Sequence, residues 1–142
     1  MIYLDTSVVV AFYVPEPAST RAERAVRSEP SPAISDLTEV EFFSAVALKV
    51  REGGLSPEDA GRVMATLLSH LAEGLYARIV LEPTHYRLAR DWFARFAVPL
   101  RTLDALHLAV ASASGAKLVT ADRALSRAAR ALGLESVLVR RH

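Results

Sequence analysis

The sequence predicts an α/β fold built on a mostly parallel sheet with helices on both faces. Short apolar runs rich in β-branched residues recur along the chain, and segments with helical periodicity lie between them. Proline and glycine residues separate these segments, and no internal repeat or low-complexity tract interrupts them. Strands that alternate with helices are typical of parallel sheets joined by right-handed crossovers.

The element boundaries follow from punctuation residues. Strands are expected at residues 2–4, 33–35, 78–81, 117–120 and 136–139. Asp5 opens a helix after the first strand, and prolines at positions 15, 17, 30 and 32 bracket the next one. Gly53 and Gly54 end a further helix, and Ser56 caps another that begins at Pro57. The remaining boundaries are marked by Pro83, Pro99, Gly115 and Gly133.

The composition indicates one globular domain over residues 1–142. Of the 142 residues, 51% are hydrophobic and 23% are charged, and a chain of this length buries about 68% of its unfolded surface. Cysteine is absent, so any metal ion must bind to oxygen or to histidine. No apolar run approaches the roughly 18 residues that span a bilayer, and we expect a soluble, cytoplasmic protein without a membrane partner.

The net charge of +1 conceals a difference between the two halves of the chain. Residues 1–71 carry 10 acidic and 6 basic side chains, whereas residues 72–142 carry 6 acidic and 11 basic ones. Solvated helix faces would explain this difference. A basic surface beside an acidic pocket would also explain it, and that arrangement suits a nucleic-acid substrate.

Two aspartates follow predicted strands. Asp5 comes directly after the first strand, and Asp122 follows the strand at residues 117–120. Ligands of open α/β sheets bind at the carboxyl ends of the strands, so both residues are candidates for one shared site. Helix capping is the alternative for each, because an aspartate at a strand-to-helix turn satisfies free backbone amides.

The helix after the second strand carries three further acids. Asp36 and Glu39 have the spacing of an N-terminal capping pair, and we assign them to structure. Glu41 is expected to face inward, where an ionised carboxylate needs a cation, an arginine partner or a raised pKa. If the phase of the helix differed by one residue, Glu39 would face inward in place of Glu41. The apolar stripe on which Glu41 lies comprises Leu37, Val40, Ser44, Ala45 and Leu48.

The segment at residues 103–113 is apolar almost all round and is predicted to be a central helix capped by Thr102. Asp104 lies in its first turn, where the helix dipole alone would stabilise a carboxylate. His107 is interpreted as a packed, hydrogen-bonded core histidine rather than a metal ligand. The other three histidines, His70, His85 and His142, form no ligand spacing.

Together the four acids not assigned to structure indicate a metal site; they are Asp5, Glu41, Asp104 and Asp122. Two carboxylates about 5 Å apart repel by roughly 3 kcal/mol at an effective dielectric constant of 20, so four in one pocket need a divalent cation. Without metal, at least one of them should have its pKa raised by its like-charged neighbours. Oxygen ligands favour Mg²⁺ or Mn²⁺, and metal-assisted phosphodiester hydrolysis is the expected chemistry. The sequence contains no phosphate-binding glycine loop, nucleophile elbow or dinucleotide fingerprint.

Four segments resemble motifs of the PIN-domain family, most closely the VapC-type toxins of bacterial and archaeal toxin–antitoxin pairs. They are residues 2–7 (IYLDTS), 35–41 (SDLTEVE), 103–109 (LDALHLA) and 119–122 (VTAD). The match follows the family's order and spacing over the whole chain, and four motifs in sequence are specific although each alone is weak. By this resemblance the acidic quartet that binds Mg²⁺ or Mn²⁺ is Asp5, Glu41, Asp104 and Asp122.

The resemblance also implies a fold, an activity and partners. It implies a three-layer α/β/α sandwich, a homodimer, and an endoribonuclease held inactive by a cognate antitoxin. Ser7 and Thr120 match supporting hydroxyl positions. Arg101 and Arg123, which lie close to two of the acids in the sequence, are our candidates for binding the RNA backbone.

Two other functions remain open at this point. A haloacid-dehalogenase-like phosphatase would also carry an aspartate after its first strand, but it needs a second aspartate where this chain has Ser7. A PIN scaffold without catalytic activity would bind RNA or a protein and cut neither. Metal-dependent cleavage separates the scaffold from the nuclease.

Overall fold

The computed structural model describes residues 1–140, and the end of the predicted domain together with His142 lies outside the described residues. Its sheet has five strands, all paired in parallel, in the order β3-β2-β1-β4-β5. Every predicted strand is confirmed to within one residue at its start and two at its end. The strands are β1 (Ile2–Leu4), β2 (Ala33–Ser35), β3 (Ala77–Ile79), β4 (Lys117–Thr120) and β5 (Ser136–Leu138).

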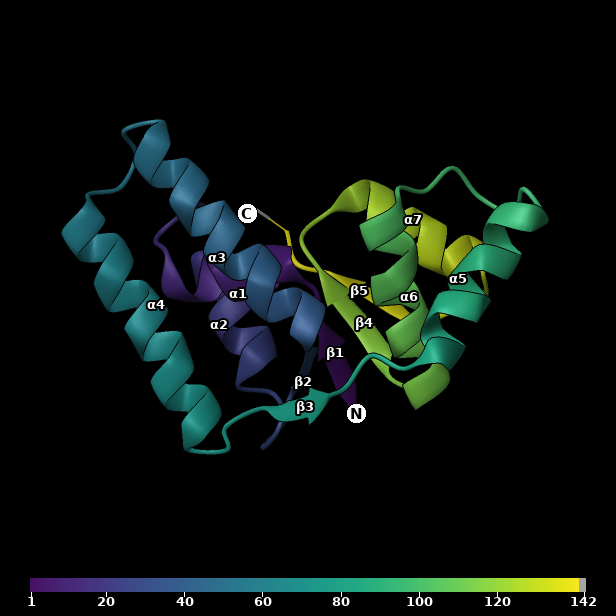
Figure 1. Cartoon of the computed structure of the whole chain (residues 1–142). Helices are drawn as coiled ribbons and strands as arrows, with labels where there is room; N and C mark the ends of the chain where they lie inside the picture. The colour runs from purple at the N-terminus through teal and green to yellow at the C-terminus, as the bar shows by residue number, and fades with distance from the viewer. Residues whose placement is uncertain (141–142) are drawn as a thin grey trace.

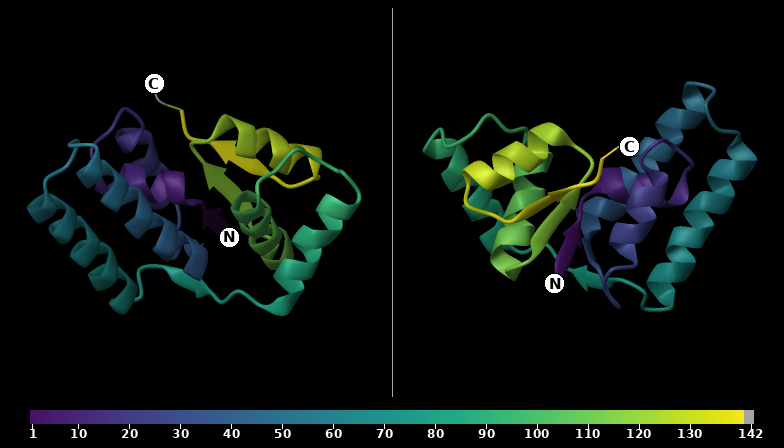
Figure 2. Two further views of the ribbon diagram at one scale, coloured as in Figure 1. Left: turned by 45° about the horizontal axis from the view of Figure 1, so that its top comes forward. Right: turned by 180° about the vertical axis from the view of Figure 1, so that it is seen from behind.

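Helices cover both faces of the sheet and complete the three predicted layers (Figure 1). The first four helices pack on one face and the last three on the other, and the view from behind in Figure 2 shows the same division. They are α1 (Thr6–Tyr13), α2 (Ser19–Val26), α3 (Asp36–Arg51), α4 (Pro57–Ala72), α5 (Pro83–Ala94), α6 (Thr102–Ser114) and α7 (Arg123–Ala131).

The central strand separates two hydrophobic cores. Successive side chains of a strand point to opposite faces, so Ile2 and Leu4 join the core under α1–α4, whereas Tyr3 joins the core under α5–α7. All three are buried, as expected for a parallel sheet that is covered twice. The phenol group of Tyr3 is therefore carried into the layer that contains α6.

The predicted central helix is confirmed. Seven consecutive residues of α6, from position 105 to position 111, are buried, and His107 among them is only 2% exposed. The predicted cap is wrong by one residue, because Arg101 occupies the N-cap position and Thr102 is the first helical residue. Asp104 remains in the first turn of the helix.

The stripe predicted on α3 is wrong. Val40 is 63% exposed and Leu48 is 46% exposed, whereas the buried residues of the helix are Thr38, Phe42 and Val46. Two of the five stripe residues are partly buried against the cores. Apolar residues occupy more than one face of α3, and periodicity alone selected a face that is mostly exposed. Among residues 1–140, no helix is long and apolar enough to cross a membrane.

Candidate active site

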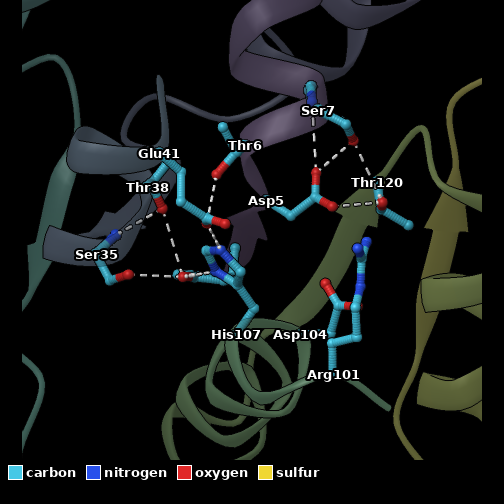
Figure 3. A network of polar contacts seen from close by, with 12 residues as sticks. Asp5, Thr6, Ser7, Ser35, Thr38, Glu41, Arg101, Asp104, His107 and Thr120 are labelled. Atoms are coloured by element: carbon cyan, nitrogen blue, oxygen red, sulfur yellow. Dashed lines mark hydrogen bonds and ion pairs between the residues drawn. The ribbon is translucent and has the colours of Figure 1, made fainter. Parts of the chain in front are cut away.

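The candidate site lies where the order of the strands changes direction, at the carboxyl ends of β1 and β4. Asp5 follows β1 directly, and its backbone N–H bonds to the carbonyl of Val119 in β4 at 3.1 Å. Glu41 comes from α3 on one face of the sheet, and Asp104 comes from α6 on the other. Figure 3 shows these side chains pointing toward the same edge of the sheet. Ligands of open α/β sheets usually bind outside the carboxyl ends of the strands at such a switch point.

Asp5 is a buried carboxylate that forms no ion pair among residues 1–140. It is 5% exposed, and its Oδ1 also accepts a long 3.4 Å bond from the N–H of Val8 at the start of α1. Burial raises the pKa of Asp5, although hydrogen bonds from Ser7 and Thr120 and the charge of His107 oppose the rise. Asp5 therefore caps α1, as one alternative held, and is also poised to accept a cation.

The two predicted supporting hydroxyls both contact Asp5 (Figure 3). Ser7 Oγ donates to Oδ1 at 2.6 Å, and Thr120 Oγ1 donates to Oδ2 at 2.7 Å. Each hydroxyl also accepts a backbone N–H from the loop after β4, at Ala121 (2.9 Å) and at Asp122 (3.0 Å) respectively. These contacts fix the orientation of the carboxylate and join the ends of β1 and β4.

Glu41, rather than Glu39, faces the site. Glu39 pairs with Arg78 of β3, as does Asp36, so these two acids form an ion cluster and not the predicted capping pair. The capping interaction at the start of α3 joins Ser35 and Thr38 instead.

The Glu41 carboxylate is partly exposed and held by two donors. Thr6 Oγ1 donates to Oε1 at 2.9 Å, and His107 Nε2 makes a short contact with the same oxygen. Burial alone would raise the pKa of Glu41, but the hydrogen bond and charge of His107 and the bond from Thr6 outweigh it and lower that pKa. The partner of Glu41 is thus a histidine and not the arginine that the sequence left open.

His107 is the packed, hydrogen-bonded histidine that the sequence predicts, but its partners were not foreseen. Its Nδ1 lies 2.6 Å from the hydroxyl of Tyr3, which also contacts Ser35 Oγ at 2.8 Å. Burial raises the pKa of Tyr3 far above its ordinary value. Nothing in the spacing of Tyr3 and Glu41 links them to His107, and only the pairing of the layers brings the three together.

Asp104 is half-buried beside an exposed arginine. Arg101 Nε lies 3.8 Å from Asp104 Oδ2, and the arginine side chain is 89% exposed. Burial raises the pKa of Asp104, Arg101 opposes the rise, and the negative charges of Asp122 and Glu41 add to it. The expected effect of like-charged neighbours is therefore present at Asp104, where burial is the larger cause.

The last two candidates lie at the start of α7. Asp122 caps this helix, since its Oδ1 accepts the N–H groups of Ala124 at 2.9 Å and Leu125 at 3.2 Å. Arg123 is exposed and lines a surface hollow with Asp122 and Arg140. Arg101 is thus engaged by an acid of the site, whereas Arg123 points to solvent beside another.

The carboxylates suit Mg²⁺ or Mn²⁺ by their chemistry. In the described part of the chain, no three acidic or histidine side chains form a ready-made ligand cluster. Mg²⁺ does not require one, because it usually keeps several waters and binds through one or two carboxylates plus substrate phosphate. The buried charge of Asp5, which forms no ion pair among residues 1–140, is the feature that a cation would neutralise.

The structure is a three-layer sandwich with acids at the switch point of its sheet. Residues 2–131 match the family described as "PIN domain". The chain belongs to the PIN-domain family. It is similar to ribonuclease VapC46 of Mycobacterium tuberculosis, with 34% identity over 136 residues that cover 94% of this chain and 93% of that protein. It is also similar to ribonuclease VapC3 of Pyrobaculum aerophilum, with 28% identity over 126 residues, 88% of this chain and 92% of that protein.

Solved structures confirm the predicted fold. PAE2754 from Pyrobaculum aerophilum has a TM-score of 0.66 and 27% identity, with 96% of this chain and 91% of that one covered. The structure of VapBC2 from Rickettsia felis bound to a promoter DNA fragment has a TM-score of 0.67 and 20% identity. The alignment covers 97% of this chain and 98% of that one. The resemblance to VapC-type proteins drawn from four short motifs is therefore confirmed by comparisons over nearly the whole chain.

Proposed function

We propose that the protein is an endoribonuclease of the VapC type that requires Mg²⁺ or Mn²⁺ and acts as the toxin of a toxin–antitoxin pair. The observation that carries this proposal is the buried Asp5 carboxylate, oriented by two hydroxyls and forming no ion pair in residues 1–140, beside acids from α3 and α6. The similarity to two ribonucleases named VapC supports the choice of RNA as substrate.

The roles of the side chains follow from their positions. Asp5 and Asp104 would hold the cation, with Glu41 and Asp122 completing its surroundings directly or through water. A bound divalent cation would supply charge neutralisation at phosphate and a water of lowered pKa. Arg123, which is exposed next to Asp122, would hold the RNA backbone, and Arg101 would do so once released from Asp104.

The proposed partners extend beyond RNA. VapBC complexes are found among the structural neighbours, as in the protein from Rickettsia felis, and we propose a cognate antitoxin for this chain as well. A homodimer acting in the cytoplasm is the expected assembly. A pull-down with the product of the neighbouring gene, followed by measurement of mass in solution, tests both partners.

The nuclease proposal is tested with purified protein, Mn²⁺ and a panel of single-stranded and hairpin RNAs. Wild-type protein should cut at least one RNA at an internal phosphodiester bond, and Asp104→Asn should not. Asp91→Asn is the matched control, because Asp91 is an exposed acid on α5 that pairs with Arg90 outside the site. If wild type and Asp104→Asn leave every RNA equally intact, the protein is a binding scaffold and the proposal is wrong.

The chemistry of the products gives an independent test. Attack by water, rather than by the ribose 2′-hydroxyl, leaves a 5′-phosphate on the downstream fragment. A 2′-deoxy substitution at the cleaved nucleotide should therefore leave cleavage possible. Products with a 2′,3′-cyclic phosphate would contradict this mechanism.

A further inference from the structure

Glu41 is held from one side only. The donors Thr6 and His107 both end on Oε1, and no residue within 1–140 donates a hydrogen bond to Oε2. A carboxylate can only accept, so the hydrogen on His107 Nε2 is the donor in either protonation state of the ring. The second oxygen is left for a ligand outside the protein.

The imidazole that holds Glu41 is itself fixed at its other nitrogen. His107 Nδ1 lies 2.6 Å from the hydroxyl of Tyr3, and that hydroxyl is anchored by Ser35 Oγ at 2.8 Å and approached by Thr38 Oγ1 at 3.5 Å. The rings of Tyr3 and His107 are also in contact, with centroids 5.7 Å apart. Both side chains are nearly fully buried, so the ring of His107 has one stable orientation.

These contacts form one chain of side chains from the core to the edge of the site. Figure 3 shows the end of this chain, where His107 meets Glu41. It begins at Tyr3 in the central strand, continues through His107 in α6 and ends at Glu41 in α3, so it crosses from one helical layer to the other. A histidine needed only for packing would have no reason to end its hydrogen-bond chain on a partly exposed carboxylate.

We propose that His107, fixed by Tyr3, is a positioning residue that orients Glu41 so that Oε2 faces the metal site. The inference rests on the proposed metal-dependent function and adds to it a residue that touches neither metal nor RNA. Partners that orient a metal-ligating side chain commonly change metal affinity by about 10- to 100-fold when they are removed. The effect expected here is of that size.

The test measures Mn²⁺ binding to the full chain without RNA, by electron paramagnetic resonance or calorimetry. His107→Leu should weaken Mn²⁺ binding by about 10- to 100-fold. His107→Gln can place an amide donor where Nε2 lies, whereas His107→Asn places it where Nδ1 lies, so Gln should retain more affinity than Asn. Tyr3→Phe keeps the ring and removes the anchor, and it should weaken binding less than His107→Leu does.

A second buried histidine provides the matched control. His85 of α5 is 6% exposed, and its Nδ1 accepts the backbone N–H of Glu82 at 2.9 Å, at the start of that helix. His85→Leu should lower the melting temperature and leave Mn²⁺ affinity unchanged. Melting curves of every variant identify any that fail to fold, and Tyr3→Phe and His107→Gln then decide the question.

The outcomes separate the inference from the function on which it rests. Wild-type protein that binds no Mn²⁺ overturns the proposed metal site and the inference together. Wild-type binding that is unchanged in folded His107→Gln, His107→Asn and Tyr3→Phe overturns the inference alone. An ordered loss, with Gln weaker than wild type and Asn weaker than Gln, supports it.

Discussion

The Asp5 carboxylate links the proposed catalysis to stability at the scale of one residue. Because burial raises its pKa, the folded protein binds this proton more tightly than the unfolded chain does, and ionisation at neutral pH costs stability. Asp5→Asn removes the charge and keeps a side chain that can still cap α1. We expect the metal-free variant in chelator to gain about 0.5–2 kcal/mol of unfolding free energy, measured by urea denaturation, while RNA cleavage is lost.

The stability advantage of Asp5→Asn should depend on pH. The advantage of Asp5→Asn should be full above the raised pKa of Asp5. It should disappear as the pH falls below the ordinary aspartate value of about 3.9, where Asp5 is protonated in both the folded and the unfolded chain. A variant that is less stable than wild type at pH 7 would show that the bonds from Ser7 and Thr120 need the charge.

Arg101 lies in the position of a competing cation. Its ion pair with Asp104 is exposed on the arginine side, and such pairs contribute at most about 1 kcal/mol, or about fivefold in affinity. Arg101→Gln should therefore strengthen Mn²⁺ binding by up to about fivefold and weaken RNA binding, as calorimetry and filter binding would measure. Weaker Mn²⁺ binding in the variant would contradict the competition.

The sequence predicted site residues best where they stand at the ends of strands. Asp5 follows β1 and Thr120 ends β4, and the parallel pairing of these strands brings the two side chains together. The family resemblance had implied only that Thr120 has a supporting role. Glu41 was chosen on a stripe that proved wrong, and it still faces the site because Thr6 and His107 hold it. Partners that come from opposite layers, as Tyr3 and Glu41 do, leave no periodic signal in the sequence.

At the scale of elements, Asp122 both caps α7 and belongs to the proposed metal site. Two substitutions separate these roles, because asparagine caps a helix about as well as aspartate and alanine does not. Asp122→Ala should cost about 1 kcal/mol of unfolding free energy, and Asp122→Asn should cost little. Both should reduce Mn²⁺-dependent cleavage, measured under conditions in which both variants are folded. Full activity of Asp122→Asn would leave this residue with the capping role alone.

Strands were easier to predict than helix faces. The five strands are short, buried and bounded by turn residues, so composition located them to within two residues. The buried side of α3 was predicted wrongly, because its apolar residues surround much of the helix and only its packing against α1 and α4 selects the buried side. The burial of α6 was predicted because a helix that is apolar all round has to be central.

At the scale of the whole molecule, the difference in charge between the halves should govern RNA binding. The basic excess lies in residues 72–142, and Arg123 presents part of it beside the acidic edge of the sheet. A side chain that neutralises one phosphate of a single strand contributes about 0.7 to the slope of log affinity against log salt. Arg123→Gln should therefore reduce the slope of RNA affinity against salt by about 0.7, measured in chelator so that no RNA is cut.

Arg27→Gln is the control, because Arg27 lies in an exposed pair with Glu23 of α2, and it should leave the slope unchanged. Equal slopes for all three proteins would contradict this role of Arg123 and place the RNA backbone away from the start of α7.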